Sequence, residues 1–152
     1  MGRNEYDELN LQTTSRKKSF IKYCEHLGVD YEIYTTKHQM TGDEGYAVMN
    51  RVISGGNVPS ALFCANDPLA MGAMQALLDV GIKVPDEVSI IGFNDVDACN
   101  FTRPTLSTVY APSSEMGEIG ASVLHNMIEG NDVFYPRRIQ LPCQLVIRKS
   151  CK

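Results

Sequence analysis

The sequence predicts an α/β fold built on a mainly parallel sheet with helices on both faces. The first observation behind this prediction is residues 61–95, where an apolar run, a helical segment and a second apolar run follow one another. The second is the run at residues 88–93, which is almost entirely apolar, as is typical of a strand buried on both faces of a parallel sheet. The third is the order of the predicted elements, because helices and strands alternate along most of the chain.

The N-terminal part predicts a loop, a helix and a strand. Residues 2–12 are polar and have no pattern, which favours a loop. A helical stripe begins at about Thr14 and ends at Gly28. The apolar members of this stripe are Phe20, Cys24 and Leu27. Residues 31–35 alternate enough for a strand, and residues 37–42 then form a loop at its carboxyl end.

The middle of the chain predicts two helices that flank a short strand. Residues 45–53 form the first helix, and residues 61–65 form the strand. The side chains of the first helix expected to face inward are Tyr46, Met49 and Ile53. Asp67 is the expected N-cap of the second helix, because the proline that follows it fits the first helical position. This helix covers residues 69–80, and Gly81 ends it.

The C-terminal part predicts a strand, a long helix and one or two final strands. Residues 106–109 form the first of these strands. Ser113 or Ser114 is expected to cap the helix, whose apolar stripe is clear. The members of the stripe are Met116, Ile119, Gly120, Val123, Leu124, Met127 and Ile128. Residues 138–148 supply the final strands, and Pro142 within them implies an edge or a bulge.

Composition limits the functions that the chain can have. Its 152 residues suit one domain with a sizeable core, and the net charge of −4 argues against non-specific attraction to nucleic acid. Five cysteines without a close pair are typical of reduced thiols in a cytosolic protein. No run approaches the length of a membrane helix, and the first residues do not resemble a signal peptide. We therefore expect a cytoplasmic protein without a membrane partner, metal or cofactor.

Two polar pairs follow the strands of the central unit. Asn66 and Asp67 come after the first strand, and Asn94 and Asp95 come after the second. Ligands of open parallel sheets bind outside the carboxyl ends of the strands, so both pairs are expected at the ligand edge. Amides and carboxylates without metal-type spacing suit a ligand rich in hydroxyl groups, because each can make a directed hydrogen bond.

The stretch CANDPLAMGAMQALLDVGIKVPDEVSIIGFND, followed by FTRPTLSTV, resembles the effector-binding domain of the LacI/GalR family of bacterial transcriptional repressors. The resemblance extends more loosely over residues 16–151. It implies the C-terminal lobe of a periplasmic-binding-protein-like domain that binds a sugar effector and forms a homodimer. It also implies that operator DNA is bound only through a head domain absent from this chain. By this resemblance residues 1–109 and 136–152 form the lobe, and residues 110–135 cross to a first lobe that is missing.

The resemblance also implies which residues contact the effector. Arg16, Asn66 and Asn94 match three contact positions of the family, with Asp67 and Asp95 in support. These five are joined by Met40, which stands where many relatives carry an aromatic residue that stacks on the ligand. Asn94 is a second departure, because many relatives have an aspartate there. An amide can still hold two neighbouring hydroxyls, but without the charge-assisted strength of a carboxylate.

The helix at residues 69–80 has more apolar surface than one sheet face requires. The additional apolar surface suggests either core packing or a dimer interface, and the resemblance favours the interface. The expected interface residues are Met71, Met74, Leu78, Cys99, Phe101 and Thr102. The helix at residues 116–128 would lack its partner lobe, so we expect it to dock on a second chain or to be poorly ordered.

Two other classes of function compete with the repressor. A solute-binding protein of a sugar transport system shares the two-lobed architecture but needs a secretion signal. An enzyme could use Asp95 with Asp97 or Glu115 with Glu118, but such spacings are commonplace. Cys24 and His26 are too few for a metal site. The sequence has no glycine-rich loop that would favour phosphate binding. Because each of these alternatives has weak support, the sugar-sensing repressor domain remains the leading hypothesis.

Overall fold

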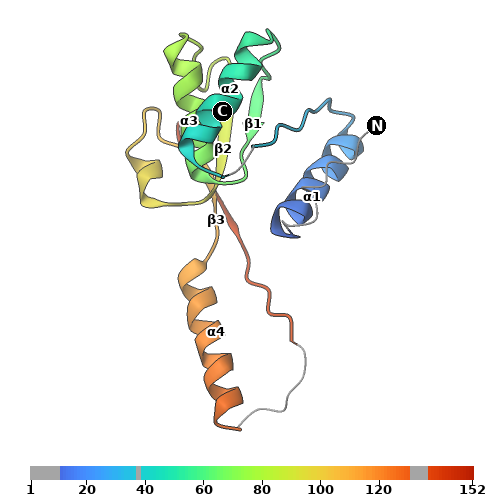
Figure 1. The fold of residues 1–152 in the computed structure, drawn as a ribbon, viewed down its shortest axis with the longest axis vertical. Helices are drawn as coiled ribbons and strands as arrows, with labels where there is room; N and C mark the ends of the chain where they lie inside the picture. Colours follow the sequence, from blue (N-terminus) through green and yellow to red (C-terminus); the bar gives the residue numbers. More distant parts are fainter. Residues whose placement is uncertain (1–10, 37–38, 131–136) are drawn as a thin grey trace. The chain divides into compact units, whose positions relative to one another are not determined.

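The computed structural model describes residues 11–36, 39–130 and 137–152 of the chain (Figure 1). Most of the loop predicted at residues 2–12 therefore lies outside the described residues, as do two residues of the loop predicted at 37–42. The chain divides into two compact units, Met1–Gln39 and Met40–Lys152.

In the described part of the first unit, a helix is followed by a segment without regular secondary structure. Helix α1 covers Leu11–Leu27, which confirms the predicted helix and starts it three residues earlier. Gly28 ends it with a φ of 64°, a conformation that glycine adopts without steric cost. The strand predicted at residues 31–35 is wrong, because this segment has no strand conformation. Alternating side chains do not make a strand unless another strand pairs with the backbone, and none of the described strands pairs with this segment.

The second unit is built on a four-stranded sheet with the order β1-β2-β3-β4. Strands β1 (Ala61–Phe63), β2 (Ser89–Asn94) and β3 (Ser107–Tyr110) run parallel, and β4 (Gln144–Val146) pairs antiparallel with β3. The predicted, mainly parallel sheet is confirmed. Strand β4 lies at the edge and begins just after Pro142, where proline costs no ladder hydrogen bond.

Two helices pack against each other beside this sheet (Figure 1). They are α2 (Gly42–Ser54) and α3 (Asp67–Asp79), and α3 also packs on β2. The helix backbones approach closely at Gly72, where an added Cβ would lie 1.9 Å from the carbonyl oxygen of Gly42. The sequence therefore needs glycine at this crossing.

The core lies mainly between α3 and the sheet. Its buried side chains are Met49, Ala70, Ala73, Met74, Ala76, Leu77, Val88, Ile90, Cys99 and Leu106. Ile90 and Gly92 of β2 are buried, whereas Ile91 and Phe93 on the opposite face are partly exposed. The prediction that the side chain of Tyr46 faces inward is wrong. Its side chain is 38% exposed, and its hydroxyl donates a hydrogen bond to Asp79 at 2.9 Å.

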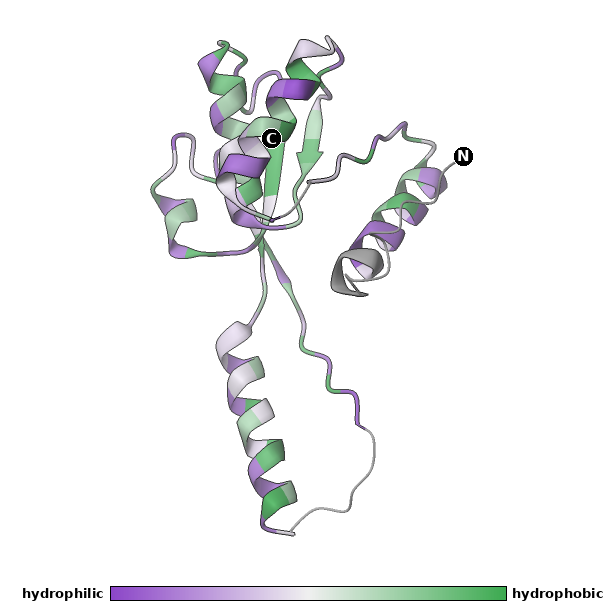
Figure 2. Cartoon of the chain, in the orientation of Figure 1, coloured by the Kyte–Doolittle hydropathy of each residue, from purple (hydrophilic) through white to green (hydrophobic). Residues whose placement is uncertain are grey.

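A 3₁₀-helix and a long exposed helix complete the second unit. The 3₁₀-helix η2 covers Asp97–Asn100, and helix α4 covers Ser113–Ile128. The predicted cap by Ser113 or Ser114 is wrong, because Pro112 occupies the N-cap position and no side chain caps the helix. No residue of α4 is buried, and Figure 2 shows that hydrophobic positions occur along its length. The helix is thus not part of the core that the described residues form.

The close crossing at Gly72 predicts a large difference between two glycine substitutions. Replacing Gly72 with alanine should lower the free energy of unfolding by about 1–3 kcal/mol, because the new methyl group meets backbone atoms that cannot move away. The control is Gly117→Ala on α4, where an added Cβ has no atom within 4 Å. That change should leave stability unchanged or raise it by about 0.5–1 kcal/mol. Urea denaturation measures both, and equal stabilities for the two variants would contradict the packing described here.

Candidate functional site

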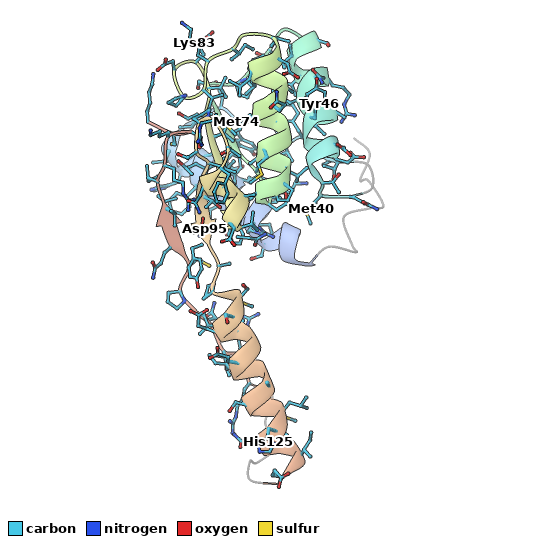
Figure 3. The ribbon with its side chains drawn as sticks, turned by 90° about the vertical axis from the view of Figure 1, so that its left-hand side faces the viewer. Met40, Tyr46, Met74, Lys83, Asp95 and His125 are labelled. Carbon is cyan, nitrogen blue, oxygen red and sulfur yellow. The ribbon has the colours of Figure 1, made fainter. Side chains whose placement is uncertain are left out.

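The carboxyl ends of β1 and β2 define the candidate site. The two strands pair in parallel, with Ala61 opposite Ser89 and Phe63 opposite Ile91, so both end at the same edge of the sheet. Asn66 and Asn94 lie at this edge, in agreement with the prediction. Figure 3 shows Met40 and Asp95 at this end of the unit and Lys83 at the other.

Asn66 is the true N-cap of α3. Its backbone is extended, with φ −153° and ψ 171°, and its Oδ1 accepts a hydrogen bond from the Leu69 backbone N–H at 2.9 Å. Its Nδ2 donates to the carbonyl oxygen of Met40 at 2.7 Å. These contacts fix the amide and link two of the predicted effector residues. They account for two of the four hydrogen bonds that an asparagine side chain can make.

Asp67 has a role that the sequence did not reveal. The prediction that it caps α3 is wrong, because Asn66 supplies the cap and Asp67 lies in the first turn. Its side chain is fully buried. One carboxylate oxygen accepts from the Val96 backbone N–H at 2.9 Å, and the other accepts from the Thr108 hydroxyl at 2.5 Å. An added Cβ at Gly92 would lie 2.2 Å from this carboxylate, so glycine provides the space for it.

The second polar pair has an unusual backbone. Asn94 and Asp95 have φ values of 112° and 61°, in the region that favours glycine. Such residues cost about 1–3 kcal/mol each and persist only where the surroundings hold them. Asp95 is held by Arg148, whose Nη1 lies 2.8 Å from its Oδ1 and also donates to the Leu106 carbonyl oxygen. Asn94 itself is exposed.

Tyr110 is a further candidate for the site, which the sequence reasoning missed. It ends β3 directly beside Asn94 in the parallel register, so it lies at the same edge. Its hydroxyl is 3.3 Å from both carboxylate oxygens of Glu115. Desolvation and then the charge of Glu115 raise the pKa of this phenol, so it is a neutral hydrogen-bond donor. The signal that could have revealed it is its position at the carboxyl end of a third predicted strand.

Burial and the nearby carboxylate of Asp67 together raise the pKa of two thiols. Burial, and next the negative charge of Asp67, raise the pKa of Cys64 to about 12. Burial and then the charge and hydrogen bonding of Asp67 raise the pKa of Cys99 to about 12 as well. Both thiols are therefore protonated at neutral pH and unreactive, since the thiolate is the nucleophilic form.

The remaining predicted site residues, Arg16 and Met40, belong to different units of the chain. Arg16 lies on α1 in the N-terminal unit and is partly buried, and its contact with an effector stays a prediction. Met40 is 36% exposed near the amide of Asn66. Among the described residues, no group of three or more His, Cys, Asp and Glu side chains could hold a metal ion. The described helices include none that is long and apolar enough to cross a bilayer.

The predicted dimer residues fall into two groups. Met74 and Cys99 are 3% and 0% exposed and belong to the core, so they offer no surface to a partner. Met71 and Leu78 are partly buried and pack against that core. Phe101 is 78% exposed, and the hydroxyl of its neighbour Thr102 donates to the Cys99 carbonyl oxygen.

The chain is similar to known proteins over almost its whole length. Residues 3–151 match the model of the periplasmic binding protein-like domain. The transcriptional repressor PurR of Haemophilus influenzae is 38% identical over 112 residues, which are 72% of this chain and 33% of that protein. A LacI-type transcription regulator from Bifidobacterium animalis superposes with a TM-score of 0.86 at 26% identity, over 99% of this chain and 55% of that one. This chain belongs to the LacI family.

Further relatives of this LacI-family chain are also regulators. The regulator GalR of Streptococcus thermophilus is 32% identical over 151 residues, which are 96% of this chain and 44% of GalR. A sugar-binding LacI-family regulator from Escherichia coli, complexed with phosphate, superposes with a TM-score of 0.81 at 29% identity, over 95% of this chain and 51% of that one. The chain thus spans less than half the length of the curated relatives named here. The predicted family and fold are confirmed.

The raised thiol pKa values predict selective labelling of the cysteines. At pH 8 iodoacetamide should modify the exposed Cys143 readily and leave Cys64 and Cys99 unmodified, because both remain protonated far above that pH. Peptide mass spectrometry measures the extent at each site, and the same reaction in urea is the control in which all five cysteines react. Modification of native Cys99 as fast as Cys143 would refute the buried cluster around Asp67.

Proposed function

We propose that this chain is the ligand-sensing part of a LacI-type repressor. It binds a sugar or glycoside at the edge where β1 and β2 end, and binding changes the affinity of a DNA-binding head for its operator. The observation that supports this proposal most is the position of Asn66 and Asn94 at the ends of adjacent parallel strands. The kind of ligand is suggested by two structural relatives, the sugar-binding regulator from E. coli and a CelR–cellobiose complex.

The chemistry of the edge suits a polyhydroxylated ligand. The Asn94 amide offers both a donor and an acceptor to neighbouring hydroxyl groups. The side chain of Asn66 is pre-oriented by its hydrogen bonds with the backbone of Met40 and Leu69, so little side-chain entropy is lost when a ligand binds. Met40 contributes an apolar surface for the non-polar face of a sugar ring. Arg16 is the proposed third polar contact, and Asp67 and Asp95 support the loops that carry the amides.

Enclosure between two lobes is the proposed source of affinity. Ligand sites normally bury most of the ligand surface, and the edge described here is one wall of such a site. The chain spans 33% of the PurR relative and 44% of the GalR relative, so the complete regulator has room for a second wall. The effector would then stabilise the closed arrangement of the lobes, which is the differential binding that allostery requires.

The exposed stripe of α4 fits the same proposal. Met116, Leu124 and Ile128 are 57%, 58% and 73% exposed, a costly arrangement for a helix with no partner. We assign this stripe to packing on the first lobe of the complete protein. The proposed homodimer surface is the part of the predicted interface outside the buried core, formed by the exposed Phe101 and the partly buried Met71, Leu78 and Thr102.

The proposal predicts a selective loss of sugar binding when Asn94 is truncated. In the complete regulator, Asn94→Ala should raise the Kd of the sugar about tenfold or more, because at least one hydrogen bond is lost and its partner hydroxyl is left unpaired. A thermal-shift screen of mono- and disaccharides identifies the sugar, and calorimetry measures the Kd. The control is Asn100→Ala, an exposed asparagine on η2, which should change the Kd by less than about twofold. Equal effects of the two substitutions would exclude Asn94 from the site.

A further inference from the structure

We propose that Asp67 is a positioning residue that holds Asn94 in the orientation needed to contact the effector. This inference rests on the proposed function for its effect on sugar binding. Asp67 does not reach the ligand edge itself, because its side chain is fully buried. It acts on the loop that follows β2 through the backbone of Val96, two residues beyond Asn94.

The contacts of Asp67 join three segments of the sheet edge. The residue begins α3 after β1, its first carboxylate oxygen accepts from Val96 after β2, and its second accepts from Thr108 within β3. Hydrogen bonds to an ionised acceptor are roughly twice as strong as neutral ones. A single buried carboxylate therefore links the segment after β1 to the loop after β2 and to strand β3.

The space for this carboxylate is built into β2. Gly92 lies two residues before Asn94, and a Cβ there would lie 2.2 Å from Oδ1 and 3.2 Å from the Cα of Asp67. Any larger residue would push the carboxylate away from Thr108 and Val96. The strand that carries Asn94 is thus shaped to receive Asp67.

The loop needs to be held because its backbone is strained. Asn94 and Asp95 both have positive φ, and they are followed immediately by the Val96 N–H that Asp67 binds. The ion pair of Asp95 with Arg148 holds the loop from the other side. Without the hydrogen bond to Val96, the backbone of Asn94 and Asp95 can relax to ordinary angles. This change turns the side chain of Asn94 away from its position.

A double-mutant cycle tests this role in sugar binding. In the complete regulator, Asp67→Ala should raise the sugar Kd about tenfold, whereas Asp67→Ala in an Asn94→Ala background should raise it less than about twofold further. A purely structural role would give the same loss in both backgrounds and would overturn the inference. The control is Leu77→Ala, a core substitution that lowers stability and leaves the Kd unchanged at temperatures where the variant is folded.

Amide hydrogen exchange tests the same role without any ligand. Asp67→Ala should raise exchange at Val96 by about tenfold or more and leave the β2 amides of Ile90 and Ile91 protected, since the only bonds lost are those of the carboxylate to Val96 and Thr108. If Asp67→Ala does not fold, Asp67→Asn decides, because a neutral amide oxygen accepts a weaker bond and should still raise exchange at Val96 measurably. Unchanged exchange at Val96 in a folded variant would overturn the inference. If no sugar binds the wild type while Val96 exchange responds as expected, the proposed function fails and the positioning of the loop stands.

Discussion

The parallel pairing of β1 with β2 is the constraint on which the rest of the structure depends. Because both strands run in the same direction and end at the same edge, the residues after them lie side by side although 28 positions separate Asn66 from Asn94. Every polar contact at the site builds on this arrangement. Asn66 anchors the start of α3, and Asp67 connects the same turn to the loop after β2 and to β3. Buried and local hydrogen bonds therefore connect the segments that carry the exposed groups of this edge.

The fold could be predicted from the sequence to the extent that its signals are local. Three local signals each predict their element: the apolar run of β2, the glycine after α1 and the proline in the first turn of α3. The family motif predicts the overall architecture. The choice between Asn66 and Asp67 as cap could not be predicted. Both residue types cap helices well, and only the long-range contacts of Asp67 with Val96 and Thr108 decide which one turns inward.

The same difference between local sequence signals and long-range contacts explains which site and surface residues were predicted wrongly or missed. Arg148 follows β4, 53 positions after Asp95, and no sequence pattern connects the two. Met74 and Cys99 have the apolar character of either core or interface, and packing alone decides that they are core. Residues 31–35 have the alternation of a strand but no strand that pairs with them in the described chain. The exposed stripe of α4 was predictable, because its pattern is local, whereas its partner is a property of the complete protein.

The central claim is that the two asparagine amides hold one polyhydroxylated ligand between them. The most direct measurement is a crystal structure of the complete regulator with the sugar identified by screening. We expect the amides of Asn66 and Asn94 both to lie within hydrogen-bond distance of sugar hydroxyl groups, with the Met40 side chain against the ring. A sugar bound elsewhere, or held at this edge without contact to either amide, would contradict it.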